Sequence, residues 1–231
     1  MITPTMRRYA AEIYRMQEER PYVSLADLAD EVGASSQAVS RLIARLRERG
    51  MVEHEPYRGV RLTRAGEQLA LPAIRRHRIT EVFLVRVLGF GWDEVHEFSD
   101  RFELGIDERI EERIFEAAGR PARCPHGEPI PGIDGQMPVL QDASLVEMKS
   151  GEDYCLSRVR IHEPEKLRYL GELGLYPGTC FRLVSQAPFN GPVRIRSGRQ
   201  EIILGHDLAA GLFVEAVSGQ SSATSHSRSE L

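Results

Sequence analysis

The sequence is poor in cysteine, which argues against a fold held together by disulfides. The 231 residues include three cysteines, Cys124, Cys155 and Cys180, which are odd in number and widely spaced. Such a set argues against a disulfide framework. We therefore expect the reducing environment of a cytoplasm, in which a thiol is free to be a core residue, a nucleophile or a metal ligand.

Long apolar runs are also missing. No segment approaches the ~18 consecutive apolar residues that span a bilayer, and residues 1–12 lack the apolar centre of a secretory signal. We therefore expect neither a membrane-spanning nor a secreted protein. The composition, 42% hydrophobic and 28% charged, is that of an ordinary globular chain, long enough for one large domain or two to three small ones.

Lysine occurs only at positions 149 and 166, so arginine supplies almost all of the positive charge. The net charge of −4 gives no case for nucleic-acid binding by the chain as a whole. However, Arg41–Arg49 holds four arginines and one glutamate. This segment is a local basic face in an acidic protein.

Two short helices near the N-terminus are predicted to form a helix-turn-helix. Ser24 is the expected N-cap of LADLADEVG, and Gly33 is its expected end. Ser35 or Ser36 is expected to cap SQAVSRLIARLRERG, which carries one apolar stripe. A basic second helix after a Gly-Ala-Ser turn is typical of DNA-binding units of this kind.

A hairpin and another helix complete this unit. The segment MVEHEPYRGVRLTRAGEQLA alternates apolar and polar residues around Tyr57-Arg58-Gly59, which predicts a wing followed by a helix that Thr63 begins. A purely structural helical domain can show the same turns, but the wing, the caps and the basic helix together favour DNA binding. The predicted DNA contacts are Ser35, Ser36, Gln37, Ser40, Arg41, Arg45 and Arg58.

Two of these contacts are expected to read bases. Gln37 and Arg41 carry an amide and a guanidinium, which pair bidentately with adenine and guanine. The other arginines of the helix and wing either contact phosphate or keep the surface soluble, and the sequence does not separate these roles.

The middle and the end of the chain differ in pattern. Residues 72–118 are helical apart from a break at Gly89-Phe90-Gly91, and Asp93 is the expected cap of one long helix that includes Val95 and Ile110. The wide apolar stripe of that helix predicts a dimer interface. Residues 153–216 alternate in short strands around one helix, which predicts a small, partly open β-barrel.

Side chains that bind transition metals concentrate in the middle of the chain. The candidates are His77 and Glu81, then His96, Asp100 and Glu103, then Cys124 and His126, and finally His162, Glu163 and Glu165. The first two groups each share one helix face because of their spacing. Imidazole, carboxylate and thiolate form a ligand set for first-row transition metals. Singly, these carboxylates are more often surface residues, and a lone cysteine is more often a buried hydrophobe.

Six collinear segments resemble the metal-dependent transcriptional repressors of the diphtheria toxin repressor and manganese transport regulator type. TPTMRRYAAEIY resembles the first helix of that family, and residues 35–70 resemble its recognition helix and wing. RRHRITEVFL and VHEFSDRFE resemble the metal-bearing helices, PHGEPIPG resembles the loop after them, and LGELGLYPGT resembles a turn in the SH3-like domain. The resemblance implies a homodimer that binds Mn(II) or Fe(II) as corepressor and then a palindromic DNA operator.

We therefore expect a mainly α fold with a small β part. The expected segments are residues 1–71 (winged helix-turn-helix), 72–144 (helical dimerisation and metal binding), 145–217 (SH3-like, FeoA-like barrel) and 218–231 (polar disordered tail).

One metal site of the family is incomplete in this sequence. Manganese-responsive members use two carboxylates of the first helix, at the positions of Arg8 and Ala11, and a histidine at the position of Leu104. The remaining ligands are His77, Asp100 and Glu103. Either the fixed charge of Arg8 replaces the metal by pairing with one of these carboxylates, or Arg8 points to solvent and a weak site survives.

A second site is better preserved, according to the resemblance. In one branch of the family its metal is held by residues that match His77, Glu81 and His96. Streptococcal manganese regulators instead use residues that match Glu81, Cys124, His126 and Glu163. We favour the latter set, with the two histidines of the former as alternates. The proline of the Cys-Pro-His step lowers the entropy that is lost when thiolate and imidazole close on one ion.

The identity of the metal and the function are open to alternatives. Thiolate and imidazole favour Zn(II) or Fe(II) by intrinsic affinity, whereas the resemblance implies Mn(II) first and Fe(II) second. In one alternative the same dimer binds DNA independently of metal, and in another its barrel binds peptides. A metal enzyme that uses Cys124 or His126 has no supporting nucleophile–base pattern, so we expect no enzyme.

Overall fold

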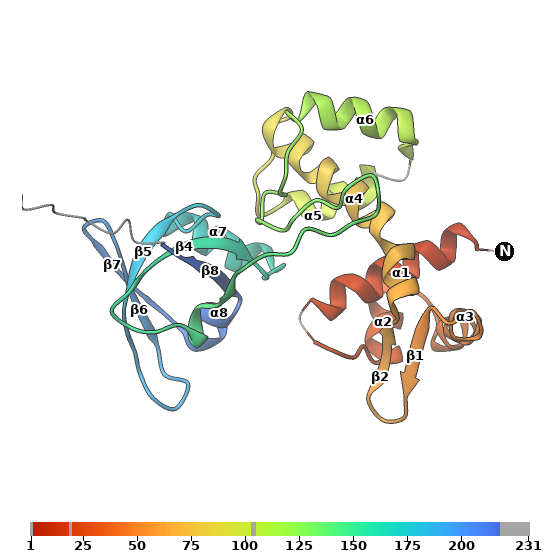
Figure 1. Ribbon diagram of the computed structural model, residues 1–231, viewed down its shortest axis with the longest axis horizontal. Coiled ribbons are helices and arrows are strands. Elements are labelled where there is room, and N and C mark those ends of the chain that lie inside the picture. Colours follow the sequence, from red (N-terminus) through yellow and green to blue (C-terminus); the bar gives the residue numbers. More distant parts are fainter. Residues whose placement is uncertain (1, 19, 103–104, 218–231) are drawn as a thin grey trace, which may run out of the picture.

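The computed structural model describes residues 2–18, 20–102 and 105–217. Figure 1 shows a winged domain and a barrel on opposite sides of the molecule, with a helical layer above and between them. Glu103, Leu104 and the predicted tail lie outside the described residues. Among the helices of the described ranges, none is long and apolar enough to cross a membrane.

The N-terminal part has the predicted winged helix-turn-helix. Its elements are α1 (Pro4–Gln17), α2 (Leu25–Val32), α3 (Ser36–Glu48), β1 (Val52–Glu55) and β2 (Gly59–Leu62). Ser24 and Ser35 cap α2 and α3 as predicted, since each side chain accepts a hydrogen bond from the backbone three residues on. Gly33 ends α2 with a φ of 62°, a left-handed conformation that favours glycine. The wing is fixed to the domain by a bridge between Val23 and Val60.

In the described residues of the middle of the chain, the α-helices are α4 (Arg64–Arg86), α5 (Val95–Phe102) and α6 (Glu108–Ala117). Thr63 caps α4 as predicted, and α4 continues through Pro72, so the proposed boundary after residue 71 falls inside a helix. The prediction of one long helix from Asp93 is wrong. Asp107 starts a separate helix because its carboxylate accepts hydrogen bonds from the backbone N–H groups of Arg109 and Ile110.

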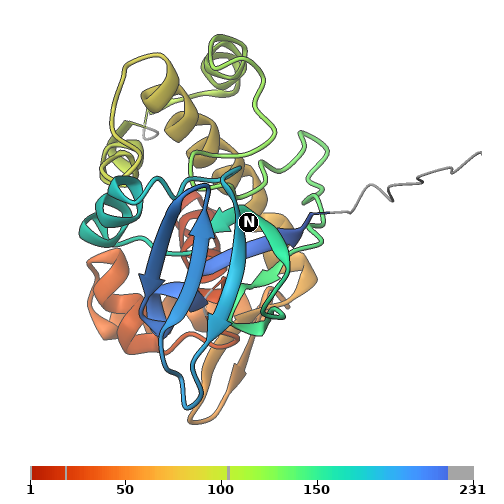
Figure 2. The same cartoon turned by 90° about the vertical axis from the view of Figure 1, so that its left-hand side faces the viewer.

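The C-terminal part is a curled, antiparallel six-stranded sheet, seen face-on in Figure 2. The strand order is β3-β8-β4-β5-β6-β7. The elements are β3 (Ala143–Ser144), η2 (Leu145–Glu147), β4 (Asp153–Val159), α7 (Pro164–Glu172), β5 (Cys180–Gln186), β6 (Val193–Ser197), β7 (Gln200–Leu204), α8 (His206–Ala210) and β8 (Leu212–Ala216). This architecture confirms the predicted barrel.

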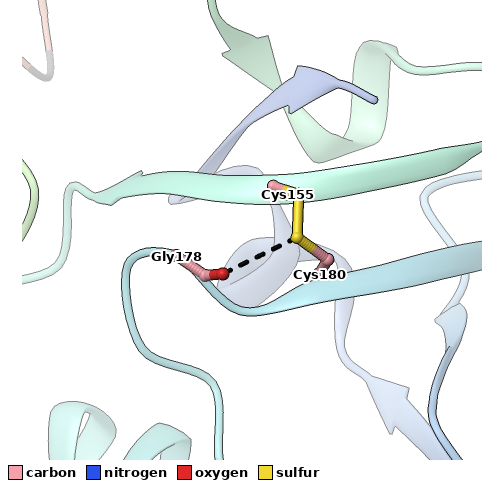
Figure 3. Close-up of a disulfide and its surroundings, with 3 residues drawn as sticks. All are labelled: Cys155, Gly178 and Cys180. Carbon is pink, nitrogen blue, oxygen red and sulfur yellow. Dashed lines mark hydrogen bonds between the residues drawn. A yellow bond between two sulfur atoms is a disulfide. The ribbon is translucent and has the colours of Figure 1, made fainter. Parts of the chain in front are cut away.

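A disulfide in the barrel corrects the expectation of unpaired thiols. Cys155 and Cys180 are bonded to each other across β4 and β5 (Figure 3), where they are direct partners in the strand register. The register places them opposite each other although 25 positions separate them, and the sequence alone does not give the register. Cys124 is free and buried, as a metal ligand requires.

Of the three hydrophobic clusters in the described residues, two include residues of α4. One belongs to the winged domain and includes Ile74, and a second joins Ile79 to Cys124. The third fills the barrel and takes in Trp92 from the segment before α5. The segment 75–78 of α4 therefore lies between the core of the winged domain and that of the helical domain.

Candidate metal centre

Helix α4 supplies the first two side chains of the site. His77 and Glu81 are one turn apart on the same face of α4, and both are buried, with exposed fractions of 3% and 2%. A buried carboxylate requires compensation by hydrogen bonds or positive charge. Glu81 receives it from imidazoles on three different segments.

The Cys-Pro-His step forms a tight loop fixed to the barrel. The Cys124 N–H donates to the Glu128 carbonyl, the Gly127 N–H donates to the Cys124 carbonyl, and the Val159 N–H of β4 donates to the His126 carbonyl at 2.8 Å. Gly127 has a φ of 89°, and a Cβ there would lie 2.2 Å from the Ser157 carbonyl oxygen. Only glycine permits this approach of the loop to β4. The predicted rigidity of the loop is thus provided by backbone bonds as well as by proline.

Glu81, Cys124 and His126 converge and are all buried. One possible ligand atom of each residue lies within 4.8 Å of those of the other two. The Nε2–H of His126 donates to the Trp92 carbonyl at 2.8 Å. Since that nitrogen carries the proton, Nδ1 is the atom left for a metal, and it lies 3.7 Å from Oε1 of Glu81.

A second group shares the same carboxylate. His77, Glu81 and His96 also lie within ligand distance of one another. Oε1 of Glu81 is 3.3 Å from His77 Nε2 and 3.0 Å from His96 Nδ1. Both groups line one cavity of about 30 Å³, which has room for one ion or water. The two ligand sets predicted from the sequence therefore share Glu81 and, apart from Glu163, belong to one cluster around it.

The charges of this cluster suit a divalent cation. Burial would raise the pKa of Glu81, but the charge of His77 and hydrogen bonds from the imidazoles hold it well below its usual value. Burial raises the pKa of the Cys124 thiol. Burial lowers the pKa of His126, but hydrogen bonds to Cys124 and Glu81 outweigh it and raise this pKa well above normal. Because a metal takes the thiolate and the neutral imidazole, binding must release protons from Cys124 and His126.

The barrel contributes a different residue from the one predicted. Glu163 is exposed and its carboxylate pairs with Lys166 at 2.6 Å, so the structure does not bring it to the cluster. Its neighbour His162 lines the cavity, with its ring 5.2 Å from the ring of His96. Burial and the nearby histidines lower the pKa of His162 to about 4, which leaves it neutral. The charged carboxylate of Glu163 is better solvated at the surface, whereas the neutral imidazole of His162 can point into the cavity.

At the metal site that is incomplete in this sequence, the arginine next to Asp100 is Arg15 and not Arg8. Arg8 donates to the Val32 carbonyl at 3.2 Å, so the alternative in which Arg8 pairs with Asp100 is wrong. Asp100 instead lies 3.6 Å from Nη1 of Arg15, and 3.2 Å from Nδ1 of His77. Arg8 and Arg15 are seven residues apart and lie on the same face of α1, two turns from each other, so helical spacing alone does not decide which of them reaches Asp100. Glu103, the other predicted partner, lies outside the described residues.

Sequence reasoning missed an arginine that connects the cluster to α1. Arg78, next to His77, is buried and donates to the Glu18 carboxylate and, at 2.7 Å, to the Pro129 carbonyl. Arg160 of the barrel donates to the Glu18 carbonyl at 2.7 Å. The end of α1, the metal-binding loop and the barrel are thereby linked. An arginine among many on a helix gave no signal of this role.

The predicted DNA-contacting residues lie on exposed surface. Ser35, Ser36, Gln37, Ser40, Arg41 and Arg45 are all exposed on α3 or at its start. The Ser35 side chain caps α3 by accepting from the Ala38 N–H. Two arginines of the wing are already paired with wing glutamates, Arg58 with Glu55 and Arg61 with Glu53.

Comparisons with known proteins agree with this arrangement. Three family profiles match in succession: "Iron dependent repressor, N-terminal DNA binding domain" over residues 1–60, "Iron dependent repressor, metal binding and dimerisation domain" over 63–132, and "FeoA domain" over 143–216. The chain is 28% identical over 228 residues to the iron-dependent repressor IdeR of Mycobacterium tuberculosis, covering 94% of this chain and 99% of that protein.

Two solved structures are similar over nearly the whole chain. A manganese-dependent transcriptional repressor in complex with manganese is 33% identical, with a TM-score of 0.82, covering 92% of this chain and 100% of that one. IdeR of T. acidophilum is 28% identical, with a TM-score of 0.80, covering 94% and 99%. The chain therefore belongs to the family of iron- and manganese-dependent transcriptional repressors, which is not a class of enzymes.

Proposed function

We propose that this protein is a cytoplasmic, homodimeric repressor that binds Mn(II), or alternatively Fe(II), and then a palindromic operator of metal homeostasis genes. The observation that carries the proposal is the buried convergence of Glu81, Cys124 and His126. These three residues would hold the ion, with His77 and His96 as alternates. His162 supplies the barrel ligand in place of Glu163.

The ligand atoms alone do not determine which metal binds, because the concentration of each free metal in the cell also decides it. A thiolate and imidazoles bind Zn(II) and Fe(II) more tightly than Mn(II) by intrinsic affinity. The relatives are described as iron-dependent or manganese-dependent repressors. We therefore place Mn(II) first and Fe(II) second, with Zn(II) as a competitor that the cell must keep scarce.

The ion would act by joining segments that belong to different parts of the fold. Glu81 lies on α4, Cys124 and His126 lie on a loop bonded to β4, and His162 precedes α7. A ligand that favours the joined state by ~5.5 kcal/mol moves a two-state equilibrium from 1:99 to 99:1. Because α4 continues from the winged domain, this change would set the spacing of two recognition helices, which must match half-sites ~34 Å apart.

The single tryptophan is a natural reporter for the ion. The ring of Trp92 stacks on that of His126, with centroids 5.7 Å apart, and its carbonyl accepts from the same imidazole. Titration with Mn(II) is expected to quench the fluorescence of Trp92, because the paramagnetic ion would be coordinated by His126. Mg(II), which prefers oxygen ligands, serves as the control and is expected to leave the emission unchanged. Equal responses to the two ions would count against a thiolate–imidazole site.

Helix α3 would enter the major groove with Gln37 and Arg41 at the bases. Arg41→Ala is expected to weaken operator binding by about 1–3 kcal/mol, or roughly 5- to 150-fold, because it removes a bidentate base contact. The matched control is Arg61→Ala, since Glu53 already pairs with Arg61 at 2.6 Å. Fluorescence anisotropy at fixed salt, with an operator selected from random duplexes in Mn(II), measures both. Comparable losses for the two variants would contradict the assignment of Arg41.

A further inference from the structure

A row of alternating acidic and basic side chains runs from the metal cluster to the first helix. Nε2 of His77 faces Glu81 at 3.3 Å, and its Nδ1 faces Asp100 of α5 at 3.2 Å. On the other side of Asp100 is the Arg15 guanidinium of α1, at 3.6 Å. Arg15 is also paired with Glu12 at 2.8 Å. The row therefore crosses from the helical domain into the DNA-binding domain.

The residues here do not fit a metal ion. Of the positions that the family resemblance assigns to this site, two hold Arg8 and Ala11, which offer no ligand atom. The cationic group that is present is the side chain of Arg15, which is 13% exposed and lies between two carboxylates. It also lines the cavity that contains Glu81, His126 and His162.

We propose that the guanidinium of Arg15 permanently takes the place of a metal ion between α1 and α5. A guanidinium is charged at all physiological pH values and can bond to two carboxylates at once. It therefore ties the DNA-binding domain to the helical domain whether or not metal is available. This inference rests on the proposed function, in which an ion binds at Glu81. It implies that the protein senses metal through that ion and not through the position that Arg15 occupies.

The arrangement has a direct consequence for stoichiometry. With Arg15 in place, each protomer offers one metal centre, at Glu81, Cys124 and His126. A second cation next to Asp100 would meet a fixed positive charge at close range, which Coulomb repulsion disfavours. Removing that charge and supplying a carboxylate would convert the same position into a cation site.

The decisive variant is Arg15→Glu, with Mn(II) binding followed by electron paramagnetic resonance. Wild-type protein is expected to bind about one Mn(II) per protomer, and Arg15→Glu about two, because the introduced carboxylate would join Asp100, Glu12 and Nδ1 of His77 as ligands. The matched control is Arg7→Glu, the same change at an exposed position of α1, which is expected to keep about one. Two ions in the wild type, or no gain in Arg15→Glu with its circular dichroism intact, would overturn the proposal.

A second pair of variants keeps the proposal testable if the reversal of charge unfolds α1. Arg15→Gln removes the charge, and the amides of α1 in metal-free protein are expected to exchange roughly 5- to 10-fold faster with deuterium, the effect of losing a partly buried ion pair. Arg15→Lys restores a positive charge and is expected to restore slow exchange. Unchanged exchange in Arg15→Gln would overturn the proposal.

The two proposals fail in different ways. Cys124→Ala in the Arg15→Glu background is expected to remove the first ion and retain the added one. If wild-type protein binds no Mn(II) but Arg15→Glu binds about one, the proposed sensing centre is wrong and the role of Arg15 stands.

Discussion

Cys124→Ala is expected to lose metal affinity by ~100-fold or more, since changes in the outer shell of a metal site alone typically cost 10- to 100-fold. Operator binding that depends on Mn(II) is expected to disappear with it at metal concentrations that saturate the wild type. The reason is that Cys124 supplies the thiol of the buried cluster around Glu81. Titrating operator binding with Mn(II), Fe(II) and Zn(II) measures the effect.

The control for this prediction uses the other cysteines. The double variant Cys155→Ala/Cys180→Ala removes the disulfide and leaves Cys124 as the single thiol. It is expected to retain the metal response, because the disulfide lies in the barrel outside the ligand cluster. An undiminished response in Cys124→Ala would show that the ion binds elsewhere, and binding that persists unchanged in chelator would favour a metal-independent regulator.

The second large effect is expected at the exposed apolar face of the helical domain. Phe102 of α5 lies 6.2 Å, between ring centroids, from Phe83 of α4. Phe83 also lines a hollow of about 560 Å³ together with Ile110 and Ile114 of α6. Phe102 and Ile110 are 43% and 45% exposed, unusually high for large apolar side chains on neighbouring helices. The matching family profile is described as a dimerisation domain over residues 63–132, so we propose this face as the dimer interface.

Ile110→Asp is expected to raise the dissociation constant of the dimer ~30-fold or more, as the loss of an interface hot spot does. In a two-fold interface the substitution buries two charges, one from each protomer. Operator affinity falls in consequence, because a monomer reaches a single half-site. Ile110 is already half-exposed in the monomer, so the fold itself is expected to survive.

The matched control is Ile203→Asp, the same change at an exposed isoleucine of β7 in the barrel. Sedimentation velocity over a range of concentrations is expected to show dimers for Ile203→Asp and monomers for Ile110→Asp. Monomers for both, or dimers for both, would place the interface elsewhere.

Local features of the fold were predictable because short-range chemistry determines them. Ser24, Ser35 and Thr63 cap their helices as expected, since a cap depends only on neighbouring backbone N–H groups. The division of the helix after Asp93 was missed because Asp107 acts as a cap within an apolar pattern that continues across it. The bond between Cys155 and Cys180 was missed because it depends on strand register.

The candidate site was predictable in its members but not in its connections. Glu81, Cys124 and His126 were identified from residue type, spacing and resemblance, and the fold brings them together. The sequence did not show whether His162 or Glu163 belongs to the cluster. Adjacent residues point in different directions, and the start of α7 fixes which of the two side chains turns inward. The role of Arg15 was not predicted either, because Arg8 and Arg15 lie two turns apart on one face of α1 and only the packing of α1 fixes which turn meets Asp100.

We propose that an ion held by Glu81, Cys124 and His126 fastens the parts of each protomer and thereby controls DNA binding. Anomalous diffraction from crystals of the Mn(II)-loaded protein tests it most directly. We expect one strong peak per protomer, within bonding distance of the Cys124 sulfur and Nδ1 of His126. A peak between His77 and Asp100, with the Cys-Pro-His loop free of metal, would contradict it.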